Sequence, residues 1–419
     1  MSQILIIDNG ACSLKAGYST DQAPLVVPNA VIKAKNERKR VFIGPEIDEC
    51  KDRTSLFYLT PFQRGYLVNW DTEHQIWDRI FAADKLNVAF GDCKLVLTDP
   101  NYCVPAIRDI SDEIIFEDYC FQAVLKTSSA LCAGYPNLQT NKFTNDFCNL
   151  VVDTGYSFTH VVPVANGSVI QSGVKRINVG GKQLTNQLKE WVSYRQMNML
   201  EETYLINECK EKCCFVASDF DAEMRKMSSN ATKKAIVREY VLPDYVTTDV
   251  GVMQTPSACG GVVNPDLASL QRILMGTERF CIPELLFRPS DVGIQGMGIA
   301  EAIALSIDSI PEALRGRMLK NIVVVGGNAL FPGFRERLQA SQGFLHSATD
   351  FREQELRSLV ESKYETAIRL SSNPVTHVWH SAAAMIAANG ENNDFVTREE
   401  YHEHGPDLCR KRFYKFSPN

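Results

Sequence analysis

The sequence predicts a layered α/β fold with two lobes, and three observations lead to this prediction. The motif LIIDNG at residues 5–10 recurs in the second half of the chain as LVVDTG at residues 150–155. Apolar strand patterns alternate with helical patterns along the sequence, as they do in α/β domains. The 419 residues, of which 45% are hydrophobic, suffice for two or more cores.

Composition narrows the class of protein. A formal net charge of −6 argues against a protein that coats nucleic acid by charge alone. No apolar run reaches the length of a membrane span, and residues 1–3 lead directly into a strand, so we expect a soluble protein that is not secreted. The thirteen cysteines are never spaced as Cys-x-x-Cys, which indicates reduced thiols in the cytosol or nucleus. Cys209, Cys213 and Cys214 are expected to pack one helix face, and no zinc site is predicted.

The elements of the first half follow from their periodicity. Residues 4–31 are predicted to form a β meander and residues 94–97 a short strand. Residues 70–86 are predicted to form a helix that Asp71 caps. A second amphipathic helix is predicted at residues 109–125, with four side chains turned inward: Ile110, Ile114, Phe121 and Leu125.

The second half repeats the β pattern. Strands are predicted from residue 149 through residues 160–164, and again at residues 321–325 ahead of Gly326 and Gly327. Helices are predicted at residues 184–199 and 201–217. Residues 244–277 are poor in charge and rich in turn residues, so a long loop or surface insertion is predicted there. A short helix at residues 262–274 and a disordered spacer are two alternatives for this segment.

Each repeated motif has the residues of a phosphate-binding hairpin. Glycine lets backbone N–H groups approach an anion closely, and an aspartate at a strand end can hold a hydrated divalent cation against the same phosphates. A single Asp-x-Gly sequence is more often a simple hairpin turn. Its recurrence favours two facing hairpins that clamp the phosphates of a nucleotide between two lobes.

These motifs resemble those of the actin family, and the resemblance covers nearly the whole chain. The two phosphate loops of actin are similar to residues 8–17 and 153–163. The segments that surround ribose and adenine in actin resemble VGGKQLT at 179–185, KEK at 210–212, VGG at 325–327 and FPG at 331–333. Three further stretches resemble the nuclear subfamily called actin-related protein six: YVLPDY at 240–245, PSDVGIQ at 289–295 and VTREEY at 396–401.

The resemblance implies an actin-like fold, which Hsp70 proteins and sugar kinases share. This fold has two lobes, built from duplicated ribonuclease-H-like domains around a central nucleotide cleft. The first large lobe is expected to contain residues 1–29, 61–145 and 376–419, with residues 30–60 as a small second subdomain. The second large lobe is expected to contain residues 146–180 and 295–375. Residues 181–294 are expected to form a fourth subdomain, with an insertion at about 244–277.

The resemblance also implies a set of nucleotide-binding residues, which would hold ATP or ADP without hydrolysis. Asp8 and Asp153 would reach Mg²⁺ through water, and no residue is assigned as a direct metal ligand. The other interpretation is that the same residues persist only as turn glycines and helix caps of a scaffold that no longer uses its cleft. The candidates are Asp8, Asn9, Gly10, Lys15, Asp153, Thr154, Gly155, Gly181, Lys182, Lys210, Glu211, Gly326, Gly327 and Phe331.

The chain departs from actin where the chemistry of hydrolysis takes place. Ser129 occupies the position at which actin has the glutamine that positions the attacking water. The serine hydroxyl is too short to replace that amide. Tyr156 occupies the position at which actin has a carboxylate that orders the water molecules bound to the metal ion. Ala11 and Leu14 alter the first loop, and Val375 replaces a lysine beside the adenine. We therefore expect no catalytic residues and no enzyme activity.

The resemblance implies a structural role in the nucleus. Members of this subfamily are noncatalytic subunits of Swr/SRCAP-type remodelling complexes, which exchange a variant histone into nucleosomes. The partners implied are the motor ATPase subunit, a zinc-HIT-domain subunit, histones and nucleosomal DNA, without a membrane. The chain could also be present in the cytoplasm.

Other functions are open to a chain of this fold. A polymerising actin-like ATPase is the main alternative, which Ser129, Tyr156 and the loss of most of the actin inter-subunit loop at residues 33–44 oppose. Self-polymerisation is therefore not expected. A sugar kinase would need a carboxylate base facing the sugar, and an Hsp70-type chaperone would need a substrate-binding region after the second lobe.

Overall fold

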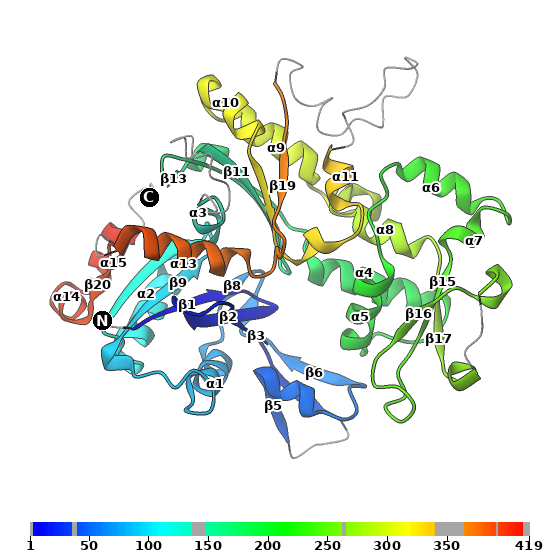
Figure 1. The fold of residues 1–419 in the computed structure, drawn as a ribbon, viewed down its shortest axis with the longest axis horizontal. Helices are drawn as coiled ribbons and strands as arrows, with labels where there is room; N and C mark the ends of the chain where they lie inside the picture. Colours follow the sequence, from blue (N-terminus) through cyan, green and yellow to red (C-terminus); the bar gives the residue numbers. More distant parts are fainter. Residues whose placement is uncertain are drawn as a thin grey trace.

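Two sheets of related topology form the centre of the computed structural model, which describes residues 3–35, 40–135, 148–261, 265–339, 364–390 and 393–413 (Figure 1). The first sheet has the strand order β20-β10-β9-β1-β2-β3. Its strands are β1 (Gln3–Asn9), β2 (Ser13–Tyr18), β3 (Leu25–Pro28), β9 (Cys93–Asp99), β10 (Ala123–Ser128) and β20 (Val396–Thr397). We call this sheet and its helices the first lobe.

The second sheet has the order β13-β12-β11-β18-β19, with β14 also paired to β12. Its strands are β11 (Cys148–Thr154), β12 (Thr159–Ala165), β13 (Ser168–Val169), β14 (Lys175–Ile177), β18 (Ile322–Val325) and β19 (Ile368–Leu370). We call this sheet, together with the helices between residues 181 and 339, the second lobe.

The two sheets repeat one arrangement. In each, an antiparallel hairpin is followed by a strand that runs parallel to the first arm, β9 beside β1 and β18 beside β11. The hairpin registers place Asp8 opposite Lys15 and Asp153 opposite His160. The layered α/β fold with a duplicated core, predicted from the two Asp-x-Gly motifs, is therefore confirmed.

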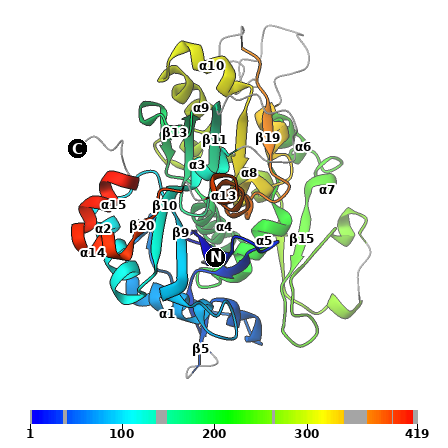
Figure 2. The ribbon, with the colours of Figure 1, turned by 60° about the vertical axis from the view of Figure 1, so that its left-hand side comes forward.

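Two helices join the lobes through a shared apolar core. They are α3 (Ser129–Ala133) and α13 (His377–Asn389), which lie between the two sheets (Figure 2). Their buried side chains pack with Ile6 of the first sheet and Val151 of the second. The indole N–H of Trp379 on α13 donates a hydrogen bond of 3.1 Å to the carbonyl of Ile6. This shared core fixes the positions of the two Asp-x-Gly hairpins relative to each other.

Two smaller sheets extend from the lobes. The first, called here the small sheet, contains β4 (Val31–Ala34), β5 (Val41–Ile43) and β6 (Leu56–Leu59). The second, called the outer sheet, contains β15 (Arg238–Val241), β16 (Val252–Gln254) and β17 (Arg272–Met275). A short hairpin of β7 (Phe62–Gln63) and β8 (Tyr66–Leu67) follows the small sheet.

The remaining helices of the described residues cover the faces of these sheets. In the first lobe they are α1 (Trp70–Phe81), α2 (Pro105–Glu113), α14 (Arg398–His404) and α15 (Pro406–Phe413). In the second lobe they are α4 (Gly181–Arg195), α5 (Thr203–Cys213), α6 (Phe220–Met227), α7 (Lys233–Ile236), α8 (Glu278–Glu284), α9 (Ile299–Asp308), α10 (Glu312–Leu319) and α11 (Phe334–Gln339).

Helix α1 begins and ends differently from the prediction for residues 70–86. Its N-cap is Asn69, not Asp71, because the Asn69 side chain accepts a hydrogen bond of 3.1 Å from the N–H of Thr72. Asp71 already lies inside the first turn. The helix ends at Phe81, and residues 82–87 form a turn closed by backbone hydrogen bonds to Ile80 and Ala82.

The prediction of one amphipathic helix at residues 109–125 was wrong. Helix α2 covers residues 105–113, a π-helical turn covers residues 114–118, and β10 begins at Ala123. Ile114 and Phe121 are buried as expected, but Ile110 is 47% exposed. Cys120 has a positive φ of 58° and so breaks the helical path. Pairing of β10 between β9 and β20 outweighs the helical periodicity of the sequence.

The segment at residues 244–277 is more ordered than the predicted loop. It contributes β16 and β17, which pair with both sides of β15. The alternative of a short helix at residues 262–274 was wrong for the described residues, since a 3₁₀ turn at Pro265–Leu267 leads to β17; residues 262–264 lie outside the described part. Strand pairing satisfies the backbone of a segment that has few charges of its own.

Cys209, Cys213 and Cys214 are buried in or directly after α5, as predicted. Within the described residues no cluster of three or more His, Cys, Asp or Glu side chains has the geometry to hold a metal ion. In the same part of the chain, none of the helices combines the length and apolar character that crossing a bilayer requires.

Candidate functional site

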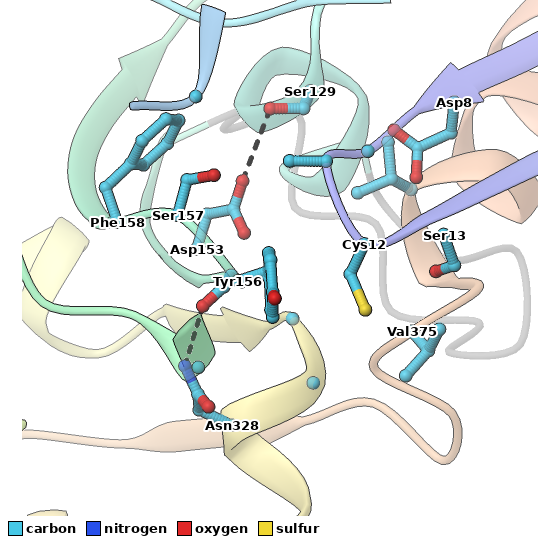
Figure 3. Close-up of a pocket in the computed structure, with 18 of the residues that line it drawn as sticks. Asp8, Cys12, Ser13, Ser129, Asp153, Tyr156, Ser157, Phe158, Asn328 and Val375 are labelled. Atoms are coloured by element: carbon cyan, nitrogen blue, oxygen red, sulfur yellow. Dashed lines mark hydrogen bonds between the residues drawn. The ribbon is translucent and has the colours of Figure 1, made fainter. Parts of the chain in front are cut away.

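A cavity of about 470 Å³ lies where the two Asp-x-Gly hairpins face each other (Figure 3). Nearly all the predicted nucleotide-binding residues line it, from Asp8 on the first hairpin to Phe331 after β18. Two do not. The Thr154 side chain is fully buried behind the hairpin, and Lys182 lines a neighbouring cavity.

The first hairpin presents a carboxylate and a lysine side by side. Asp8 is the last residue but one of β1, and its Oδ1 accepts a hydrogen bond of 2.8 Å from the Thr98 hydroxyl. Its Oδ2 lies 3.3 Å from Nζ of Lys15, the residue opposite it on β2. Lys15 Nζ also donates to the carbonyl of Ser13 at 3.2 Å. Strand pairing thus holds one negative and one positive group at the edge of the cavity.

Asn9 supports this hairpin from behind. Its amide Nδ2 donates a hydrogen bond of 2.6 Å to Oε1 of Glu73, and its Oδ1 accepts one of 2.9 Å from Asn29. Asn29 also donates to the carbonyl of Gly10 at 3.1 Å. Burial raises the pKa of Glu73 to about 7, and hydrogen bonds led by the one from Asn9 oppose that rise. The Asn9 amide is therefore committed to positioning the turn.

The second hairpin presents Asp153 at the end of β11. Its Oδ2 accepts a hydrogen bond of 3.4 Å from the Ser129 hydroxyl at the start of α3. Burial, followed by the charge of Asp8 across the cleft, raises the pKa of Asp153 to about 6, while Lys15 acts in the opposite direction. At the two facing hairpins, the carboxylates of Asp8 and Asp153 therefore lie near the single lysine Lys15, a local excess of negative charge that a bound cation would offset.

The start of helix α4 is docked onto the second hairpin. The N–H groups of Gly181 and Lys182 donate to the carbonyls of Gly155 and Tyr156 at 3.0 and 2.9 Å. Asn328 Nδ2 donates to the same Gly155 carbonyl at 2.7 Å. A Cβ on Gly180 would lie 2.5 Å from the Tyr156 carbonyl, so glycine is required for this close approach.

Lys210 and Glu211 come from the end of α5. Lys210 is 3% exposed, and its Nζ donates to Thr185, Asn207 and the carbonyl of Gly181 at 2.8–3.2 Å. Glu211 accepts a hydrogen bond of 2.7 Å from the Asn207 amide. Burial lowers the pKa of Lys210. These two residues form the wall of the cavity on the α4–α5 side.

The two glycines after β18 shape the opposite wall. Gly326 has a φ of +95°, and a Cβ there would lie 2.2 Å from the carbonyl of Thr154. A Cβ on Gly327 would meet nothing within 4 Å, so this residue leaves open space beside the cavity. An aromatic and an aliphatic side chain, Phe331 and Val375, line the same cavity. This wall fits the flat apolar face of a base.

Tyr156 occupies the middle of the cleft. In Figure 3 it lies between Cys12, on the first hairpin, and Asn328. Burial raises its pKa, and the nearby Cys12 adds to the shift. A phenol in this environment stays neutral at physiological pH. It therefore supplies no anionic oxygen to the waters of a metal.

Several lining residues were not nominated from the sequence. His160 on β12 is 2% exposed, and burial and Arg176 lower its pKa to about 3, so it is neutral. Because His160 lies in the strand that follows the second Asp-x-Gly motif, its place in the cavity could have been inferred from the sequence. Cys12, Asn207 and Asn328 also line the cavity. Asn328 directly follows the glycine pair, but the amides gave no signal of their own because their partners come from distant segments.

The donor set fits a nucleotide with a hydrated cation. Asp8 and Asp153 have the hard oxygens that Mg²⁺ prefers, Lys15 has the charge for a phosphate, and Gly327 leaves room beside the apolar wall. The fit is incomplete at Tyr156, where no carboxylate is present.

Comparison with known proteins identifies the relatives of this chain. The family model described as Actin matches residues 1–414. Actin-like protein C08B11.6 of Caenorhabditis elegans is 42% identical over 415 residues, covering 98% of this chain and 92% of that protein. Actin-related protein 6 of Drosophila melanogaster is 38% identical over 405 residues, covering 96% and 97%. Actin-related protein 6 of Arabidopsis thaliana is 33% identical over 437 residues, covering 99% and 100%.

Proposed function

The chain belongs to the actin family, and we propose that it is a noncatalytic structural subunit of a nuclear Swr/SRCAP-type complex that exchanges a variant histone into nucleosomes. Full-length similarity to proteins named Actin-related protein 6 supports this placement. The actin-like fold generally binds nucleotide in its central cleft. The observation that carries the noncatalytic role is the contact between Ser129 and Asp153.

That contact removes the means of activating water. The short Ser129 hydroxyl is directed to Asp153, the carboxylate that would hold the waters of a cation. Tyr156, whose pKa is raised, supplies a neutral phenol beside it. A nucleophile displaced by about an ångström reacts on the order of a hundredfold more slowly. We therefore propose that the chain retains ATP or ADP as a structural ligand.

Two of the residues that would hold this ligand, Lys15 and Asp8, are already paired with each other. Lys15 would neutralise phosphate charge, and Asp8 and Asp153 would bind the cation through water. A divalent cation, when bound, neutralises phosphate charge and polarises the phosphoryl group. Glu211 and Phe331 line the part of the cavity proposed for the nucleoside. None of these residues is offered as a catalytic base.

The proposed partners are the motor ATPase subunit, a zinc-HIT-domain subunit, histones and nucleosomal DNA, and the proposed location is the nucleus. The segment that leads into β16 supports a partner surface, since Val246 is 91% exposed and Val250 is 51% exposed. Exposed apolar side chains that gather on one segment, as these do with Val252 and Met253, mark interaction surfaces, whereas singly exposed ones do not. Self-polymerisation is not proposed.

The test is native purification of the tagged full chain from nuclear and cytosolic fractions, followed by mass spectrometry. Recovery from the nuclear fraction with a remodelling motor, a zinc-HIT-domain protein and histones is expected. Recovery alone, or as a self-polymer from the cytosol, would contradict the proposal.

A matched pair of variants tests the partner surface. Val246→Asp is expected to reduce recovery of one or more partners. Val104→Asp, at a position 52% exposed near the start of α2, is expected to leave recovery unchanged. Equal recovery with both variants would place the partner surface elsewhere.

A further inference from the structure

The small sheet contacts the start of α5 across the mouth of the cleft. Both oxygens of Glu202 accept hydrogen bonds from Ser55: Oε2 from the backbone N–H at 2.9 Å and Oε1 from the hydroxyl at 2.8 Å. Ser55 directly precedes β6, and Glu202 directly precedes α5. One carboxylate thus joins segments that are 147 residues apart. Hydrogen bonds to an ionised group are among the stronger ones in proteins.

A second pair reinforces this contact. Arg53 NH1 donates a hydrogen bond of 2.6 Å to the Tyr204 hydroxyl, and its guanidinium lies over the Tyr204 ring at 5.4 Å. Arg53 NH2 also contacts Asp48 at 3.3 Å. The Tyr204 ring packs against the apolar core of the small sheet, which includes Ile32 and Phe42. The Tyr204 side chain, which belongs to the second lobe, therefore packs against the core of the small sheet as well as against that of its own lobe.

The turn that carries these groups is preorganised. Asp52 Oδ1 accepts hydrogen bonds from the N–H and the hydroxyl of Thr54 at 2.9 and 2.7 Å. Ser55 has a φ of +49°, which is rare for a residue other than glycine. Such a conformation persists only where surrounding contacts hold it. The contacts to Glu202 are those that Ser55 makes in this conformation.

A third tyrosine, Tyr58, lies near this contact and near the nucleotide cavity. Tyr58 on β6 has its pKa raised by burial, and the nearby phenols of Tyr204 and Tyr156 add to the shift. Tyr58 packs against the same apolar core as Tyr204, and it also lies near Tyr156, which lines the cavity. Because their pKa values are raised, the phenols of Tyr58 and Tyr156 are neutral.

We propose that Arg53, Ser55, Glu202 and Tyr204 form a clasp that holds the mouth of the cleft closed whether or not a nucleotide is bound. None of the four residues lines the cavity, so the clasp needs no ligand to form. Its consequence for a ligand rests on the proposed function: a nucleotide would leave only when the clasp opens. The clasp thus favours a retained nucleotide over one that exchanges rapidly.

Hydrogen exchange of the full chain, measured by mass spectrometry, tests the clasp without any nucleotide. In Glu202→Ala, the peptide covering residues 50–58 is expected to exchange about tenfold faster, because the Ser55 N–H loses its acceptor. Glu201→Ala is the control, since Glu201 is an exposed neighbour and the contacts to Ser55 come from Glu202. Unchanged exchange of β1 and β11 shows that the variants fold.

A second pair of variants keeps the test independent of Glu202. Arg53→Ala is expected to accelerate exchange of the same peptide and of the start of α5, whereas Lys51→Ala at an exposed neighbouring position is not. If both carboxylate variants and both basic variants exchange at the wild-type rate, the clasp does not hold the mouth and the proposal is overturned. Acceleration confined to Glu202→Ala and Arg53→Ala supports it.

A separate experiment measures the rate at which a fluorescent nucleotide, ATP carrying a methylanthraniloyl group, is released from the protein. If the probe binds, its release is expected to be about tenfold faster from Glu202→Ala than from Glu201→Ala. Equal release rates would overturn the inference that the clasp controls exit. If the probe does not bind to any variant, the proposed nucleotide role fails, while hydrogen exchange still decides whether the clasp exists.

Discussion

The Ser129 hydroxyl donates a hydrogen bond of 3.4 Å to Oδ2 of Asp153. This contact joins α3, which lies between the lobes, to the second phosphate-type hairpin. In a cleft that hydrolysed ATP, the residue at position 129 would instead reach toward a water at the terminal phosphate. In the proposed noncatalytic cleft, the pair therefore links the absence of a water-positioning amide at position 129 to the surroundings of Asp153.

The wild-type chain is expected to show no ATP turnover above background in a phosphate-release assay with Mg²⁺. The double variant Ser129→Gln with Tyr156→Asp is expected to hydrolyse ATP faster, by up to about a hundredfold, because it restores the water-positioning amide and the carboxylate. The single variant Tyr156→Phe serves as the control and should leave turnover at background. A wild-type rate comparable to that of actin filaments would contradict the noncatalytic proposal.

Glu73→Gln is expected to flatten the dependence of stability on pH. Burial raises the pKa of Glu73 from 4.5 to about 7, so the folded chain binds this proton more tightly than the unfolded chain does. The stability that the proton contributes is complete below pH 4.5 and is lost as the pH rises through 7. The loss amounts to at most about 3 kcal/mol, and Gln, which stays neutral, avoids it.

The measurement is the free energy of unfolding by urea at several pH values between 4.5 and 8. Glu113→Gln, at an exposed position on α2, is the control and should follow the wild type. Parallel curves for Glu73→Gln and the wild type would show that Glu73 does not titrate in this range.

Gly65→Ala is expected to destabilise the contact between the β7–β8 turn and the second lobe. Gly65 has a φ of +82°, and a Cβ there would lie 1.9 Å from Cε1 of Phe158. Arg176 stabilises the same contact, since its guanidinium lies 4.6 Å from the Phe158 ring centre and NH1 donates to the Tyr66 hydroxyl at 2.8 Å. We expect a loss of about 2–4 kcal/mol in the free energy of unfolding.

Thermal and chemical unfolding measure this loss. Gly91→Ala is the matched control, because its Cβ would meet nothing within 4 Å and its φ is not positive. Similar stability for both variants would mean that the turn moves away from Phe158 at little cost.

Asp112→Asn is expected to destabilise the first lobe by about 3–5 kcal/mol, because it leaves the buried Lys126 without its counter-ion. Lys126 Nζ lies 2.5 Å from Asp112 Oδ1, and both side chains are fully buried. Ser111 accepts a further hydrogen bond of 2.9 Å from Lys126. Chemical denaturation at neutral pH measures the change.

The control is Asp109→Asn, which breaks a partly exposed ion pair between Asp109 and Arg410 of α15. Solvent screens such pairs, so a loss of only about 0–1 kcal/mol is expected. Equal losses of stability for the two variants would show that the buried Asp112–Lys126 pair is no more important for stability than the exposed Asp109–Arg410 pair.

The sequence by itself determined the duplicated hairpins. Asp8 and Asp153 each end a buried strand, and the glycine turn that follows requires a local conformation that neighbouring residues dictate. Similarity along the chain likewise placed the substitutions at Ser129 and Tyr156. These features could be predicted because they depend on short segments and on ordered motifs.

The tertiary structure decided the elements that depend on distant partners. Residues 121–125 have a helical pattern, yet Phe121 leads into β10, where two neighbouring strands supply backbone hydrogen bonds. In the same way β16 and β17 form because β15 pairs with them. The contacts of Ser55 with Glu202 and of Asn9 with Glu73 join segments that are 147 and 64 residues apart. Local propensity has no information about such partners, and only the packed lobes bring their side chains within hydrogen-bonding distance.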